Sequence, residues 1–221
     1  MLGSGADYKR AAHELGYPVV VKPARGAGCL GVSIARDGVQ LRRAIDIAHQ
    51  VNGTGPLLLQ RYVAGVAASV SLLVDGRRAV PLALNAQWVR RSPQSGNGRD
   101  ASTARWQLLS YGGGKTPLDH ALAERALETA VRTCESVPGL QGYIGVDLVL
   151  TKSEAIVIEV NPRLTTAYLG ARAAFDENVA ELVLAACGGV LPSALAPRRT
   201  VRFTSSGRIQ SAPTTIEASL R

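Results

Sequence analysis

The sequence has few cysteines, few aromatic residues and no long apolar run. Its three cysteines (Cys29, Cys134 and Cys187) are far apart and lack metal-ligand spacing, which predicts reduced thiols and argues against a disulfide framework or a zinc site. No segment approaches the length of a membrane span, and no basic-then-apolar leader opens the chain. We therefore expect a cytoplasmic protein without a membrane partner.

Aromatic surface for binding nucleic acid is also scarce. The chain carries 25 basic and 17 acidic residues, a net charge of +8, and all but four of the basic residues are arginine. These arginines are spread along the chain, and two Phe and two Trp offer little surface for stacking on bases. We expect no nucleic-acid partner. An anionic small-molecule substrate, or a genome-wide preference for arginine, accounts for the charge as well.

Patterns typical of short strands outnumber helical patterns along the 221 residues. With 46% apolar and 19% charged residues, the composition is that of a globular protein with one large or two small domains. Strands joined by short turns alternate with single helices, which predicts an α+β fold with antiparallel sheets rather than a doubly wound parallel sheet. The expected helices are 6–15, 38–51, 118–137 and 176–187, and the expected strands are 18–23, 32–35, 57–63, 68–74, 77–84, 106–111, 145–150, 156–161, 200–204 and 208–211.

Three local signals add detail to this pattern. Asp75-Gly76 predicts a tight hairpin turn. Thr116 and Pro117 are expected to be the cap and first residue of the long helix 118–137. The polar stretch 90–102 is expected to be a mobile loop, and a lid is one role for it.

Two acids lie in a predicted hairpin near the middle of the second half. The apolar segments 145–150 and 156–161 flank a short polar turn, and a turn centred on Ser153 places Asp147 opposite Glu159. Because side chains alternate along a strand, Glu159 and Asn161 share one face, while Ile158 and Val160 take the other. Like charges facing each other across a sheet are unfavourable. We therefore expect a cation between them.

The chemistry of this hairpin favours magnesium. Two carboxylates and an amide oxygen, without Cys or His, are hard ligands that suit Mg²⁺, which usually completes its shell with water and phosphate oxygens. The alternative is a pair of solvated surface acids. Arg163 follows two residues after Asn161 and either holds phosphate or forms a surface pair with Glu159.

A lysine and a glycine-rich loop near the start of the chain form a second candidate site. Lys22 ends a predicted strand, and three glycines (Gly26, Gly28 and Gly31) follow within nine residues. Backbone N–H groups of such a loop can surround phosphate oxygens. The order differs from a Walker A motif, because the lysine precedes the glycines. The alternative reading is an ordinary turn between strands.

Together these segments resemble the ATP-grasp superfamily over about residues 17–190. The shared features are the lysine strand with its glycine loop, a hinge strand 57–63, and an Asp before a Glu-x-Asn-Pro-Arg strand. The resemblance implies an α+β ATP-grasp fold in which two subdomains with antiparallel sheets grip ATP. It also implies a small subdomain 17–63, a large subdomain 64–221, and a residual helix 1–16 from a truncated region. The family normally has an N-terminal α/β domain before the lysine strand, where this sequence has only about twenty residues, so we expect a fragment, a partner polypeptide that supplies the missing part, or a homodimer.

Further segments narrow the resemblance. Residues 64–72, 84–87 and 110–113, with Pro117, look like carbamoyl-phosphate-synthase-like ATP-grasp ligases, and 161–170 resembles the tyramine–L-glutamate ligases of methanofuran biosynthesis. The implied reaction joins an amino acid to an amine, both small molecules, through an acylphosphate made with ATP. The alternatives are a ligase for another pair of substrates and a nucleotide-binding module without turnover.

The resemblance also assigns roles to individual residues. Lys22 and the three loop glycines would contact the ATP phosphates, and Asp147, Glu159 and Asn161 would bind two Mg²⁺ ions, with Mn²⁺ as an alternative, while Arg163 would steady the transferred phosphate. The adenine hinge would comprise Gln60, Arg61, Tyr62 and Val63. The acceptor pocket would comprise Thr165, Thr166 and Tyr168, with Gln87, Tyr111 and Asn85 as weaker members that are equally well explained as satisfied polar residues at strand ends. Ser69 would contact the ribose in place of an acidic residue, and Arg90, Arg91, Arg99 or Arg105 would pair with a substrate carboxylate.

Overall fold

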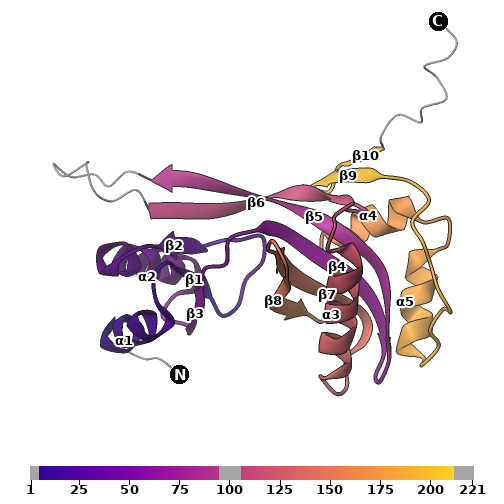
Figure 1. Cartoon of the computed structure of the whole chain (residues 1–221), viewed down its shortest axis with the longest axis horizontal. Helices are drawn as coiled ribbons and strands as arrows, with labels where there is room; N and C mark the ends of the chain where they lie inside the picture. Colours follow the sequence, from indigo (N-terminus) through magenta and orange to yellow (C-terminus); the bar gives the residue numbers. More distant parts are fainter. Residues whose placement is uncertain (1–4, 95–105, 212–221) are drawn as a thin grey trace, which may run out of the picture. The chain divides into compact units, whose positions relative to one another are not determined.

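The chain divides into two compact units in the computed structural model, which describes residues 5–94 and 106–211 (Figure 1). One unit comprises Met1–Val63 and Val89–Tyr111, and the other comprises Ala64–Trp88 and Gly112–Arg221. The expected division placed all of 64–221 in one subdomain. The segment Val89–Tyr111 instead groups with the first unit, where strand β2 (Ser33–Ala35) pairs with the first part of β6 (Trp106–Thr116) through Ser33 with Leu108.

The first unit is a small antiparallel sheet with two helices. Strand β1 (Val19–Pro23) lies between β3 (Leu57–Arg61) and β2 (Ser33–Ala35), and β2 pairs with β6 (Trp106–Thr116). Alternate residues of β1 are buried, so one face of the strand packs against the core that helix α1 (Gly5–Leu15) and helix α2 (Gly38–Asn52) help to form. That core comprises Tyr8, Ala12, Val19, Val21, Ala35, Leu41, Ala44, Ala48 and Leu57.

Helix α2 begins where a side chain can cap it. Asp37 has extended backbone and accepts hydrogen bonds of 2.8 Å from the backbone N–H groups of Val39 and Gln40. An aspartate at this position satisfies N–H groups that have no partner within the helix. The predicted helix 38–51 is confirmed to within one residue.

The second unit is built on a larger antiparallel sheet. Four of its strands run in the order β5 (Ala79–Gln94), β4 (Val66–Asp75), β7 (Gln141–Leu150) and β8 (Ala155–Asn161), with β8 at the edge. The hairpin between β4 and β5 turns at Gly76, whose φ of 99° suits glycine at the first central position of a two-residue turn. The predicted turn is thus confirmed.

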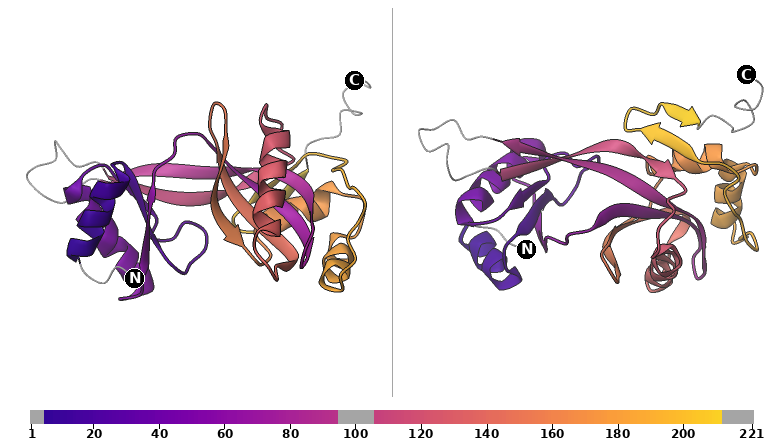
Figure 2. Two further views of the ribbon diagram at one scale, coloured as in Figure 1. Left: turned by 60° about the horizontal axis from the view of Figure 1, so that its bottom comes forward. Right: turned by 45° about the horizontal axis from the view of Figure 1, so that its top comes forward.

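The two faces of this sheet are covered differently. Helix α3 (Ala123–Glu135) packs on the face that carries Val70, Leu72 and Val146. On the other face, α4 (Ala167–Ala174) and α5 (Val179–Cys187) cover the end near Leu73 and Tyr143. Figure 2 shows α3 and α5 on opposite sides of the sheet. The rest of that second face carries polar side chains.

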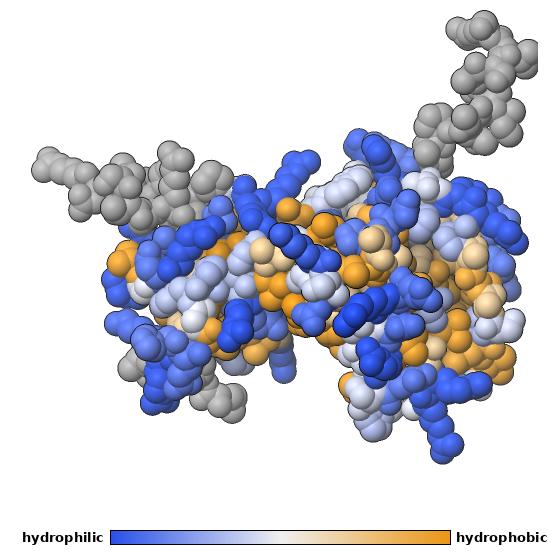
Figure 3. All heavy atoms as spheres, in the orientation of Figure 1, coloured by the Kyte–Doolittle hydropathy of each residue, from blue (hydrophilic) through white to orange (hydrophobic). Residues whose placement is uncertain are grey.

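Two further strands complete the second unit. Strand β9 (Val201–Thr204) pairs with the end of β6 and with β10 (Ile209–Ser211), which confirms both strands predicted for the tail. Apolar side chains are exposed on the surface over α5 (Figure 3), where Leu184 is 72% exposed. Among the described residues, no helix is both long enough and apolar enough to cross a membrane.

Three predicted elements differ from the structure. Strand β6 does not end at Tyr111 but continues through three glycines to Thr116. The neighbouring backbone comes so close to Gly113 and Gly114 that a Cβ at either would overlap a backbone carbonyl, so glycine is what allows the strand to continue here. The long helix begins at Ala123, since Thr116 is buried in β6 and its hydroxyl bonds to Asn85. The capping role of Thr116 was therefore wrong. Helix α4 was not predicted, and β5 extends to Gln94, into the expected loop.

Candidate functional site

The hairpin β7–β8 places its two acids face to face. Asp147 pairs with Glu159, and Gly145 pairs with Asn161, so the predicted register of the acid pair is confirmed. Glu159 is exposed, Asp147 is half-buried and Asn161 is buried. The two carboxylates and the amide therefore lie on one face of the hairpin at its open end.

A β-bulge sets this arrangement. Nearer the turn, Leu148 pairs with Val157, and the register shifts between Asp147 and Leu148. Continued without the shift, the pairing would place Ile158 opposite Asp147 and turn Glu159 toward the apolar core. Val157 and Val160 pack against that core. Ile158 is the extra residue of the bulge, so the simple alternation that grouped it with Val160 does not hold at this residue.

Amide and guanidinium groups surround the acids. Asp147 Oδ2 accepts a hydrogen bond of 3.2 Å from Asn161 Nδ2, and Asp147 Oδ1 accepts one of 2.8 Å from Gln87 Nε2. Asn161 Oδ1 accepts a bond of 3.2 Å from Arg163. Both of these bonds to Asp147 come from side-chain amide N–H groups, which donate to its carboxylate oxygens. Gln87, expected as a weak acceptor-pocket residue, thus lies at the predicted metal ligands.

The residues at this site fit a hard divalent cation. Asp147, Glu159 and Asn161 offer two carboxylates and one amide oxygen, the ligand types that Mg²⁺ prefers. Ser69 pairs with Asp147 across β4 and β7, and its buried hydroxyl has no hydrogen-bond partner among the described residues. A hydroxyl in this position could bond to a metal-bound water. No group of three or more His, Cys, Asp and Glu suited to a metal occurs in 5–94 and 106–211, and the side-chain oxygen that accompanies the two acids here is that of the Asn161 amide.

The expected acceptor residues lie beside a tyrosine that the sequence did not single out. Tyr143 Oη lies 3.3 Å from Thr165 Oγ1 and 2.7 Å from Ser71 Oγ. Its ring meets the ring of Tyr168 edge-to-face, with centroids 5.8 Å apart. Burial raises the pKa of the Tyr143 hydroxyl. Tyr143 therefore links two of the three predicted acceptor residues, while the third, Thr166, is the N-cap residue of α4.

The two other weaker members of the expected pocket are Asn85 and Tyr111. Asn85 is fully buried, donates to Ser69 and Ala83 carbonyls and to Ser71 Oγ, and accepts from Thr116 Oγ1 at 2.7 Å. These bonds match its alternative reading as a satisfied polar residue. Tyr111 belongs to the first unit, whereas Thr165 and Tyr168 belong to the second.

Lys22 and the hinge residue Gln60 share a face of the first sheet. Lys22 pairs with Leu58, and Val20 pairs with Gln60. On β1, Val20 and Lys22 lie on the face opposite to the buried Val19 and Val21, and Gln60 lies on that same face because it is directly opposite Val20. The local alternation of β1 therefore keeps the Lys22 side chain away from the helix-covered core.

The glycine loop is made of two consecutive turns. Leu30 N donates to Ala27 O across Gly28 and Cys29, which both have positive φ (67° and 62°). Val32 N then donates to Cys29 O across Gly31, with φ of 71°. Left-handed backbone is adopted readily only by glycine, so Gly28 and Gly31 are needed for the loop. Gly26 does not have a positive φ, and a Cβ there would meet nothing within 4 Å. The loop geometry therefore does not require glycine at this position.

The hinge residues are the last two residues of β3, Gln60 and Arg61, and the two that follow it, Tyr62 and Val63. Tyr62 N donates to Pro18 O at 3.0 Å, and Arg61 Nε donates to Leu15 O at 3.1 Å. The guanidinium of Arg91, on β5, lies 5.3 Å from the centre of the Tyr62 ring, a cation–π geometry. Val63 is the last hinge residue and ends the first segment of this unit. Arg90 is exposed on β5, and Arg99 and Arg105 lie outside the described residues, as does most of the expected lid.

Each unit thus gathers part of the predicted set. The second unit brings together Asp147, Glu159, Asn161, Arg163 and Gln87. The first holds Lys22, the loop glycines and the hinge. The only sequence signal that could have placed Gln87 and Tyr143 near the site is strand alternation. Gln87 lies two residues from Asn85 and Tyr143 four residues from Asp147, so each shares a face of its strand with a candidate site residue.

Comparisons with known proteins agree with this arrangement. Residues 7–167 match the family described as the ATP-grasp domain. Tyramine–L-glutamate ligases of Methanocaldococcus jannaschii and Methanocaldococcus fervens are 29% and 32% identical over 127 residues, 58% of this chain. The chain spans only 35% and 36% of their length.

A solved structure shows the same fold at low sequence identity. The biotin carboxylase domain of Hydrogenobacter thermophilus 2-oxoglutarate carboxylase, solved with MgADP, ADP and bicarbonate, matches with a TM-score of 0.67. The match covers 91% of this chain and 44% of that one, at 19% identity. The expected α+β ATP-grasp fold is thereby confirmed.

Proposed function

Because this chain belongs to the ATP-grasp domain family, we propose that it serves an ATP-dependent ligase that joins a carboxylate to an amine through an acylphosphate. The observation that carries the proposal is the register of Asp147 with Glu159, beside Asn161. Support also comes from the relatives named tyramine–L-glutamate ligase. The chain spans about a third of those relatives, so the activity proposed is that of the whole protein.

The proposed reaction has two steps. A carboxylate oxygen of the first substrate attacks the γ-phosphorus of ATP, forming an acylphosphate as the bond to ADP breaks. The amine nitrogen of the second substrate then attacks the acyl carbon, loses a proton and expels inorganic phosphate. Neither step needs a nucleophilic side chain. The protein's contribution is to position the substrates, to stabilise phosphate charge and to keep water from the acylphosphate.

Residues of the first unit would bind the nucleotide. The side chain of Lys22 lies on the face of β1 opposite to the core, and its ammonium group would contact the α- and β-phosphates. Gly26, Gly28 and Gly31 let the loop backbone approach phosphate oxygens, since no side chain blocks it. The hinge after β3 would receive the adenine through backbone groups, with Tyr62 already fixed by its bond to Pro18.

Residues of the second unit would hold the metal. Asp147 and Glu159 would hold one Mg²⁺, and Glu159 with Asn161 a second, with Mn²⁺ as a substitute. When bound, such a cation offsets negative charge on the phosphate oxygens. Arg163 would hold the phosphate being transferred, because its guanidinium can donate two parallel hydrogen bonds to phosphate oxygens.

The substrate pair we favour is L-glutamate and tyramine, in the synthesis of a methanofuran-type cofactor. The support is the name of the relatives and the position of Thr165, Thr166 and Tyr168 after the metal-binding strand. The Tyr143–Tyr168 pair offers an aromatic surface for the ring of the amine. The alternatives are another amino acid and amine, and a nucleotide-binding module without turnover.

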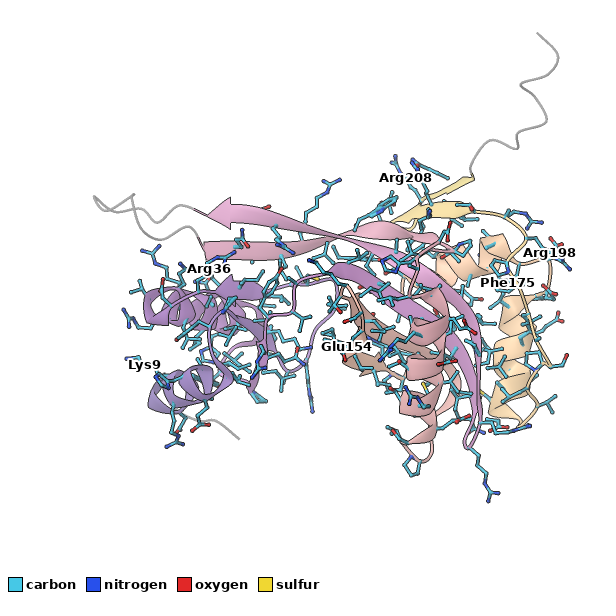
Figure 4. All side chains as sticks on the ribbon, in the orientation of Figure 1. Lys9, Arg36, Glu154, Phe175, Arg198 and Arg208 are labelled. Carbon is cyan, nitrogen blue, oxygen red and sulfur yellow. The ribbon has the colours of Figure 1, made fainter. Side chains whose placement is uncertain are left out.

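ADP release measured across a panel of amines and amino acids tests the proposal. We expect wild type to release ADP only with a suitable substrate pair, and Glu159→Gln to reduce the rate at least about 100-fold, as expected when an electrostatic contribution to phosphoryl transfer is lost. Glu154→Gln is the matched control, because Glu154 is exposed in the turn of the same hairpin (Figure 4). Equal ADP release by wild type and Glu159→Gln would contradict the ligase proposal, and nucleotide binding without release would favour the module.

A further inference from the structure

We propose that Gln87 is a positioning residue of the metal site, which holds the Asp147 carboxylate in the orientation that a divalent cation requires. The inference rests on the proposed function, and it moves Gln87 from the acceptor pocket, where the sequence placed it, to the metal ligands. It is carried by the 2.8 Å hydrogen bond from Gln87 Nε2 to Asp147 Oδ1.

The path of this contact across the sheet is unusual. Asp147 pairs with Ser69, and Ser69 pairs with Asn85, so β4 lies between the strands of Gln87 and Asp147. Gln87 is two residues beyond Asn85 and therefore on the same face. Its side chain must reach over β4 to meet the acid. A shorter amide at position 87 would not span two strand spacings of about 4.8 Å each, so the length of glutamine is used in full.

The two amides at Asp147 have different relations to a metal. Asn161 bonds to Oδ2 and is itself one of the proposed ligands, on the strand next to Asp147. A cation bound by Asn161 and Asp147 would replace the bond between them. Gln87 bonds to the other oxygen, Oδ1, and that bond can persist when Oδ2 binds a cation. Gln87 therefore fixes the rotation of the carboxylate and leaves Oδ2 directed toward Asn161.

The physical effect is on metal affinity. A carboxylate held by one hydrogen bond loses less rotational freedom when it binds a cation, and partners of this kind typically change metal affinity 10- to 100-fold. A residue that only contacted the acceptor would leave metal affinity unchanged. Metal binding therefore separates the two roles of Gln87 without any need for turnover.

The test is titration of the full chain with Mn²⁺ in the presence of ADP, with free Mn²⁺ measured by electron paramagnetic resonance. Gln87→Leu and Gln87→Met both remove the donor at similar volume, and we expect each to weaken Mn²⁺ binding about 10- to 100-fold. Gln210→Leu is the matched control, since Gln210 is exposed on β10, and it should bind as wild type does. Thermal melts identify any variant that fails to fold, and having two variants keeps the test decisive.

The outcomes separate this inference from the proposed function. If wild type binds no Mn²⁺, the metal site and the proposed function both fail. If wild type binds Mn²⁺ and the folded Gln87 variants bind it equally well, only the positioning role of Gln87 is overturned. Tighter binding by the variants would also overturn it, because Gln87 would then be competing with the metal for Asp147.

Discussion

Asp147 and Glu159 face each other across β7 and β8 at the point where a bulge shifts the pairing of the two strands. The bulge lets Val157 pack in the core while Glu159 remains on the polar face. A pair of acids held this close is unfavourable without a cation. The hairpin therefore uses backbone geometry to keep a charge arrangement that simple alternation would not produce.

The glycine loop should depend on one glycine much more than on another. Gly31→Ala introduces a side chain at φ of 71°, and its Cβ would lie 3.2 Å from both Pro23 and Val51. We expect a loss of about 1–3 kcal/mol in the free energy of unfolding, measured with urea. Gly26→Ala has open space and should change stability by less than about 0.5 kcal/mol. Equal effects of the two variants would contradict the loop geometry.

Removing the Tyr143 hydroxyl should destabilise the second unit. Tyr143→Phe leaves Ser71 and Thr165 without one hydrogen-bond partner each, and the cost should be about 1–2 kcal/mol in urea unfolding. Tyr168→Phe keeps the edge-to-face ring contact and should cost less than about 0.5 kcal/mol. If Tyr143→Phe is as stable as wild type, the hydrogen-bond chain contributes nothing.

Arg163 should oppose metal binding when no nucleotide is present. Its guanidinium bonds to Asn161 Oδ1, a proposed ligand, and adds positive charge beside the site. Arg163→Met should therefore raise Mn²⁺ affinity about 3- to 10-fold without nucleotide, as expected for exposed charges a few ångströms apart, and weaken ATP binding. Arg172→Met, an exposed position on α4, is the control. A fall in Mn²⁺ affinity for Arg163→Met would contradict this account.

The buried Cys134 thiol should make stability depend on alkaline pH. Burial, with a smaller effect of Glu135, raises the pKa of this thiol from 9.0 to about 11. Between these values the unfolded chain loses the proton first, so the stability contributed by the neutral thiol is present below pH 9 and is lost as pH rises toward 11. Unfolding of wild type and Cys134→Ala, compared across this range, isolates the effect from other titrating groups. A pH-independent difference between them would contradict it.

Much of the fold could be predicted because its signals are local. The helix 38–51, the Asp75-Gly76 turn and the two strands of the β7–β8 hairpin each depend on a few neighbouring residues. The elements that were missed depend on distant contacts. Thr116 looked like a helix cap, but a buried bond to Asn85 keeps it in β6. Helix α4 carries Gly170, which packs against Thr116 and the Phe203 ring, a contact that local pattern does not reveal.

The candidate site shows the same division. Asp147, Glu159 and Asn161 lie on adjacent strands of one hairpin, and a turn centred on Ser153 paired the two acids correctly, although the bulge that brings them into register was not predicted. Gln87 approaches Asp147 from β5, with β4 between them, and only the strand order places it there. Tyr143 meets Tyr168 and Thr165 because α4 folds back over the sheet. Such relationships follow from tertiary packing rather than from spacing along the chain.

The most direct test of the central claim is the affinity for Mn²⁺ with ADP in wild type, Glu159→Gln and Glu154→Gln. The two substitutions remove one negative charge each from the same hairpin, but only Glu159 faces Asp147. A metal site between the acids predicts that Glu159→Gln weakens Mn²⁺ binding at least about tenfold, because affinity for hard cations follows the number of charged ligands, while Glu154→Gln binds as wild type does. Equal Mn²⁺ affinity in wild type and Glu159→Gln would contradict the claim.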